Sequence, residues 1–192
     1  MKSSAVAARF SGMSDTAERY RKVAAAFTER VEQVPAGAWD NPTPCEGWAA
    51  RDIIRHIVDT TAYFLGDKMA ADLPSVDEDP VAAWKAARDQ IQSALDDPAL
   101  ATMEVESPMG TSTFEHLVGI FGVGDVLVHT WDLARATGLD ETLDPVEVSR
   151  LFAFMQPMDE MMRQGGAFGP KVEVPDDADE QTRLIAFTGR TP

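Results

Sequence analysis

Apolar residues recur every three or four positions along most of this chain, and prolines separate the stretches in which they do so. This spacing gives a helix one apolar face, while proline at a boundary stops one helix from running into the next. The predicted helices run from 14 or 15 to near 35, 49 or 50 to about 66, 80 to 95, 114 to 136, and 145 to about 164. A late amphipathic segment covers 179–187, and the alternating residues 102–114 indicate a short hairpin or an irregular extended loop. The sequence therefore predicts an all-α helical bundle with at most one short hairpin.

Proline and glycine residues refine the predicted ends of these helices. Asp97-Pro98 is expected to end the third helix, and Gly138 to end the fourth. Pro157 lies inside the fifth predicted helix and should kink or divide it. No linker or internal repeat divides the 192 residues, so we expect an N-terminal arm over 1–13 and a single domain over 14–192.

The charge balance argues against several partners. Lys and Arg number 17 and Asp and Glu 32, which gives a net charge of −15. A chain this acidic repels nucleic acid and anionic membrane surfaces, and it has no cluster of Lys and Arg. We expect no secretory leader, because Arg9 interrupts the first apolar stretch, and the sequence has no run of about 18 apolar residues and only Cys45 as a thiol. We therefore expect a soluble cytoplasmic protein that binds neither nucleic acid nor membrane.

Two of the three histidines point to a metal site. Asp125 and His129 are four residues apart in a predicted helix, so their side chains lie about 40° apart on one face. A carboxylate and an imidazole placed this way can reach one divalent ion. His56 interrupts the apolar face of another predicted helix and needs a polar partner there. If the two helices face each other, His56, Asp125 and His129 form a two-histidine, one-carboxylate metal site.

Simpler interpretations stay open for each residue. The same three side chains could only hydrogen-bond to one another within the core. His116 lies on the opposite helix face from Asp125, so we interpret it as structural or exposed. Cys45 has acidic Glu46 beside it and no basic residue within two positions, which favours a structural thiol over a nucleophile. Four methionines at helical spacing are interpreted as core filler, with an adaptable pocket as the alternative; they are Met155, Met158, Met161 and Met162.

Three segments of the chain resemble those of a known family. Residues 44–56 read P-C-x-G-W-x-x-x-D-x-x-x-H, and residues 125–134 read D-V-L-V-H-T-W-D-L-A. The ending F-G-P-K-V-E-V-P at 168–175, with Arg183-Leu184 and Gly189-Arg190, is similar to one subgroup of single-domain members. Together the segments resemble the mycothiol-dependent maleylpyruvate isomerase N-terminal family, within the DinB/YfiT-like superfamily of metal-binding proteins.

The resemblance implies a DinB-like four-helix bundle with extra short helices. It also implies a divalent metal ion, most often zinc or nickel, held by His56, Asp125 and His129. A homodimer is a further expectation from the superfamily. The implied activity is that of a transferase or isomerase that uses a small thiol of the mycothiol type and a small electrophilic substrate. The alternative is a metal- or ligand-binding, stress-associated protein without catalysis.

Overall fold

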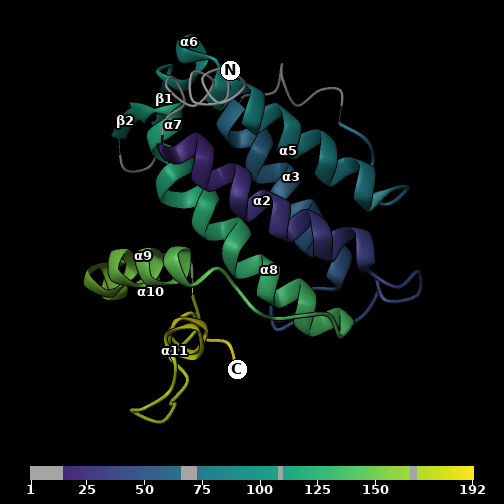
Figure 1. Cartoon of the computed structure of the whole chain (residues 1–192), viewed down its shortest axis with the longest axis vertical. Coiled ribbons are helices and arrows are strands. Elements are labelled where there is room, and N and C mark those ends of the chain that lie inside the picture. Colours follow the sequence, from purple (N-terminus) through teal and green to yellow (C-terminus); the bar gives the residue numbers. More distant parts are fainter. Residues whose placement is uncertain (1–14, 66–72, 108–109, 165–167) are drawn as a thin grey trace, which may run out of the picture. The chain divides into compact units, whose positions relative to one another are not determined.

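The computed structural model describes residues 15–65, 73–107, 110–164 and 168–192. The predicted N-terminal arm, the end of the second predicted helix at Gly66 and the hairpin residues Pro108 and Met109 lie outside these ranges. The helices and strands (Figure 1) are α2 (Asp15–Gln33), α3 (Ala50–Leu65), α5 (Pro80–Asp96), α6 (Pro98–Ala101), β1 (Glu104–Ser107), β2 (Gly110–Thr113), α7 (Phe114–Leu117), α8 (Val123–Thr137), α9 (Pro145–Met155), α10 (Asp159–Gln164) and α11 (Glu180–Phe187). In the described residues the β-structure is limited to the antiparallel hairpin β1–β2 and an isolated bridge, so the predicted all-α class is confirmed.

Aspartate followed by proline starts three of the helices. Asp79, Asp97 and Asp144 each accept hydrogen bonds from backbone N–H groups of the first turn, and the proline after each stands where no N–H partner is needed. The prediction that Asp97-Pro98 ends a helix is confirmed, since Asp97 is the C-cap residue of α5. Asp97 also begins α6, whose four residues are too few for periodicity to reveal.

The chain divides into two compact units, and the first contains residues 15–28 and 54–126 of the described part. Its helices α2, α3 and α5 run alongside one another (Figure 1). The rings of Phe27 in α2 and Trp84 in α5 meet edge to face, with centroids 4.7 Å apart. The indole Nε1 of Trp84 donates to Thr28 Oγ1 at 2.9 Å, and Trp84 is fully buried. This aromatic contact and its hydrogen bond fix α5 against α2.

The predicted single helix from 114 to 136 is wrong in its first third. The structure has α7, then a π-helical turn (Val118–Gly122), then α8. Gly119 lies in this turn so close to α2 that an added Cβ would stand 2.8 Å from Thr16 Oγ1. The helix is thus wound more widely over the turn that approaches α2. The spacing of apolar residues in the sequence does not encode this contact between Gly119 and Thr16.

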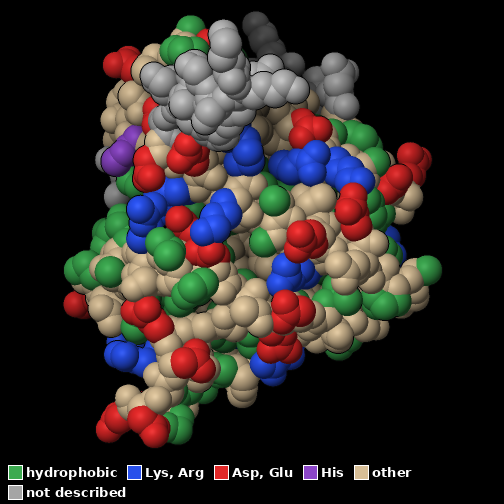
Figure 2. All heavy atoms as spheres, viewed as in Figure 1, with side chains coloured by type: hydrophobic (Ala, Val, Ile, Leu, Met, Phe, Trp, Pro, Cys, Tyr) green, Lys and Arg blue, Asp and Glu red, His purple; other side chains and the backbone are tan. Residues whose placement is uncertain are grey.

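The stretch from Phe114 to Thr137 is long and apolar enough to cross a membrane by length and composition. However, 72% of its most apolar window is buried inside the protein. A helix that is buried in a protein core has this character. On the face of the molecule that Figure 2 shows, Lys and Arg side chains lie interspersed with Asp and Glu.

The second unit contains residues 29–53 and 127–192, apart from 165–167, which are not described. The rings of Phe152 in α9 and Phe187 in α11 meet with centroids 5.6 Å apart. Pro157 divides the predicted fifth helix as expected, because a 3₁₀ turn (Gln156–Met158) separates α9 from α10. Gly138 ends α8 with φ of +72°, also as expected.

The interpretation of the methionine cluster as core filler is wrong for most of its members. Met155 is buried, but Met161 is 53% exposed, and Met158 and Met162 are half-buried. Helical spacing places these side chains relative to the helix axis and says nothing of whether another element covers them.

Candidate metal centre

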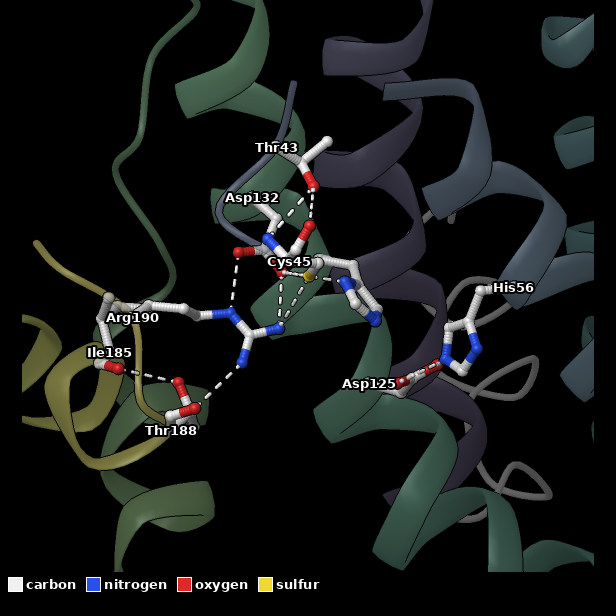
Figure 3. A network of polar contacts seen from close by, with 9 residues as sticks. Thr43, Cys45, His56, Asp125, Asp132, Ile185, Thr188 and Arg190 are labelled. Carbon is white, nitrogen blue, oxygen red and sulfur yellow. Dashed lines mark hydrogen bonds and ion pairs between the residues drawn. The ribbon is translucent and has the colours of Figure 1, made fainter. Parts of the chain in front are cut away.

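His56 and Asp125 come together in the first unit from helices that are far apart in the sequence. His56 Nε2 lies 3.1 Å from both carboxylate oxygens of Asp125 (Figure 3). The side chains are 34% and 28% exposed, so the pair is reachable from solvent. His56 stands on α3, and Asp125 stands in the first turn of α8. The predicted approach of the helix around His56 to the helix around Asp125 is therefore confirmed.

His129 follows Asp125 by one turn along α8 and is buried, with 6% exposure. Asp125 and His129 are four residues apart on α8, so the helix places both side chains on one side, and His56 contacts the first of them. Two imidazole nitrogens and one carboxylate oxygen are donors that suit zinc and nickel, and three protein ligands leave coordination positions for water or a substrate. The residue types and the helical spacing therefore fit the divalent ion that the sequence predicts.

A second cluster surrounds the other ring nitrogen of His129, within the second unit. His129 Nδ1 lies 2.9 Å from Asp132 Oδ2, and Asp132 is fully buried. Arg190, which follows α11, donates two hydrogen bonds to the same carboxylate (Figure 3). Its Nε donates to Oδ1 and its Nη2 donates to Oδ2, both at 2.7 Å. Such a fork is the strongest common geometry for a guanidinium and a carboxylate.

The electrostatics of this cluster keep its charges in place. Burial works to raise the pKa of Asp132, but the hydrogen bonds from His129 and Arg190 outweigh burial and hold that pKa below its usual range. Burial likewise works to lower the pKa of Arg190, and its hydrogen bonds with Asp132 raise the pKa instead. Asp132 is thus a carboxylate that only accepts hydrogen bonds, so His129 Nδ1 carries a proton and donates it. His129 would then bind a metal through Nε2.

Cys45 lies at the edge of this cluster. Its Sγ is 3.5 Å from Asp132 Oδ2 and 3.4 Å from Arg190 Nη2. Cys45, His129 and Asp132 form a second group of potential metal ligands. A cation there would have to displace Arg190 from the carboxylate that it already neutralises, so the group with His56 is the better candidate. The local sequence gives Cys45 no basic neighbour, whereas the fold brings Arg190 to it from 145 positions away.

The sequence predicts part of this site and misses the rest. His116 is exposed and apart from the candidate ligands, as expected. Asp132 was detectable in principle, because it follows His129 by three residues and therefore lies on the same helix side. Arg190 was noted only in the resemblance of the chain's ending, and nothing in its local sequence links it to α8.

Comparisons with known proteins show the family of the chain. Residues 20–134 match the family model of the mycothiol maleylpyruvate isomerase N-terminal domain, a range that contains all three candidate ligands. Two curated relatives are uncharacterised proteins of Mycobacterium tuberculosis, one from strain CDC 1551 / Oshkosh and one from strain ATCC 25618 / H37Rv. Each is 31% identical over 170 residues, which span 86% of this chain and 92% of the relative. No solved structure matches the chain significantly.

Proposed function

Because the chain belongs to the mycothiol maleylpyruvate isomerase N-terminal domain family, we propose that it is a metal-dependent enzyme that uses a small thiol. In this proposal His56, Asp125 and His129 bind one divalent ion, zinc or nickel. The reaction is the transfer of a mycothiol-type thiol to a small electrophile, or an isomerisation that proceeds through such an adduct. The observation that carries the proposal is the contact of His56 with Asp125, with His129 one turn further along α8.

The chemistry of the ligand set supports this reaction class. A divalent ion bound at an open site stabilises a thiolate near neutral pH, and the thiolate is the nucleophilic form of the sulfur. Of the three proposed ligands, His129 is buried, whereas the side chains of His56 and Asp125 are 34% and 28% exposed. In this proposal small molecules reach the ion from the side of His56 and Asp125.

The remaining features of the proposal concern the whole protein. We propose one domain over residues 14–192, a cytoplasmic location and a homodimer as the working assembly. The net charge of −15 supports a protein that works on small molecules without nucleic acid or membrane partners.

Metal content and affinity test the metal site directly. Protein purified without chelator should carry about one zinc or nickel ion per chain by elemental analysis. His56→Ala and Asp125→Ala should lose that ion, because each removes a third of the protein ligands. His116→Ala is the matched control, since this histidine is exposed and apart from the ligand set, and it should keep the ion. Unchanged metal content in the two ligand variants would refute the site.

Turnover separates catalysis from binding alone. Metal-loaded and metal-free protein are compared with mycothiol and a panel of electrophiles, following the loss of free thiol. Thiol-dependent turnover by the loaded protein only is the expected result. Tight metal binding without turnover would instead support the alternative, a non-catalytic metal- or ligand-binding, stress-associated protein.

A further inference from the structure

We propose that Asp132 and Arg190 are positioning residues that fix His129 for metal binding, so that the segment after α11 completes the site. This inference rests on the proposed function, because it assumes that His129 is a metal ligand. Residues 20–134 match the family model, and Arg190 lies beyond them. The proposal thus gives a role at the site to a part of the chain that the family match does not cover.

The first step of the argument is the continuity of the contacts. Arg190 donates a hydrogen bond of 2.7 Å to each carboxylate oxygen of Asp132. Asp132 Oδ2 also accepts a hydrogen bond of 2.9 Å from His129 Nδ1. A histidine ligand whose second nitrogen donates to a carboxylate is held in one tautomer and one ring orientation, and the carboxylate makes it a better donor to a metal. Trp48 also stacks on the His129 ring, with centroids 5.9 Å apart. The imidazole is thus restrained at its edge and on its face.

The second step concerns charge. Asp132 has no exposed surface, and a buried carboxylate without a cation is costly. The Arg190 side chain is 12% exposed and supplies the required positive charge. Without Arg190, the Asp132 carboxylate would lose both of the 2.7 Å hydrogen bonds that hold it in place. The acceptor that lies 2.9 Å from His129 Nδ1 would then no longer be fixed.

The third step is how the backbone aims Arg190. Gly189 has φ of +86°, and an added Cβ would lie 3.1 Å from the backbone of Gly169 and from the carbonyl oxygen of Pro170. Only glycine accommodates both the left-handed conformation and this close approach. Arg190 Nη1 also donates to Thr188 O at 3.3 Å (Figure 3). The turn after α11 is therefore built so that the guanidinium points at Asp132.

Metal affinity measured on the full chain tests the proposal. Zinc dissociation constants are obtained by competition with a chromophoric chelator for Asp132→Asn, Arg190→Met and the double variant. Each should bind zinc about 10–100-fold more weakly than the parent protein, the usual effect of losing an outer partner of a ligand. Arg190→Lys keeps the charge but not the fork, and it should fall between Arg190→Met and the parent protein. The absorption spectrum of the cobalt-loaded variants should also shift, because the donor strength of His129 changes.

Two controls separate positioning from folding. Arg135→Met is the matched control, because Arg135 also follows His129 on α8 but pairs with Glu141 near the surface, and its zinc affinity should not change. The double variant removes both buried charges together, so it is the variant that retains its fold if a single substitution does not. Wild-type zinc affinity in a folded double variant, with binding still lost in His129→Ala, would overturn this inference alone. Binding that survives in His56→Ala, Asp125→Ala and His129→Ala would instead refute the proposed function.

Discussion

Replacing Gly119 by alanine measures how closely the π-helical turn approaches α2. The new Cβ would stand 2.8 Å from Thr16 Oγ1, 3.4 Å from its Cγ2 and 3.7 Å from its Cβ. Ordinary contacts begin near 3.4 Å, so the two elements must separate or Thr16 must turn. Turning is restricted, because both branches of the threonine side chain already lie within reach of the new methyl group.

The expected free energy follows from two opposing effects. Alanine in place of glycine stabilises a helix by about 1 kcal/mol, whereas overpacking a well-filled contact costs about 1–3 kcal/mol. Gly119→Ala alone should therefore lower the free energy of unfolding by up to about 2 kcal/mol. In a Thr16→Ala background the clash is absent, and the same substitution should stabilise the protein by up to about 1 kcal/mol.

Urea unfolding of the four proteins in this double-mutant cycle gives the interaction energy. A value of about 1–3 kcal/mol between positions 16 and 119 is expected, since the two residues are in direct contact. Thr16→Ser is a useful third background, because serine keeps the oxygen but can rotate it away from the new methyl group. If Gly119→Ala has the same effect with threonine and with alanine at position 16, the close approach described for this turn is incorrect.

Two further predictions concern stability. Trp84→Phe removes the hydrogen bond to Thr28 and part of the buried ring, so it should lower the free energy of unfolding by about 2 kcal/mol. Urea unfolding measures this loss, and a value below about 0.5 kcal/mol would contradict the role assigned to that contact. Asp179→Ala should cost about 1 kcal/mol, since Asp179 caps α11 by accepting from the backbone N–H of Thr182. This bond, with that of the Thr182 hydroxyl, lowers the pKa of Asp179, so its contribution is present above about pH 4 and is lost as the pH falls through the lowered value. The stability difference between parent and variant should therefore shrink in acid, and a difference that grows below pH 4 would contradict this assignment.

The sequence is a good guide wherever the structure depends on local geometry. Asp125 and His129 could be placed on one helix face because four residues of α-helix have only one arrangement. The starts of the helices at Pro80 and Pro145 were also predictable, since a proline in the first turn of a helix acts locally. The approach of His56 to Asp125, 69 residues away, could be anticipated because a histidine on an apolar face needs a polar partner.

The features that the sequence did not reveal depend on contacts between distant elements. The π-helical turn accompanies the contact of Gly119 with Thr16, and neither residue is unusual in its own segment. The exposure of Met161 depends on what covers α10, which helical spacing does not specify. The pairing of Arg190 with Asp132 depends on the direction in which the chain leaves α11, and that direction is set where Gly189 meets Gly169.

The pair formed by Arg190 and Asp132 has a consequence for the order of folding events. It joins positions 58 residues apart, so the chain must close a long loop before the guanidinium reaches its carboxylate. Contacts of such high sequence separation tend to form late, after helices such as α8 have gained their local hydrogen bonds. A partly folded chain would accordingly contain His129 on a formed helix before its imidazole is locked in orientation, and maturation of the ligand set would lag behind the appearance of helical structure.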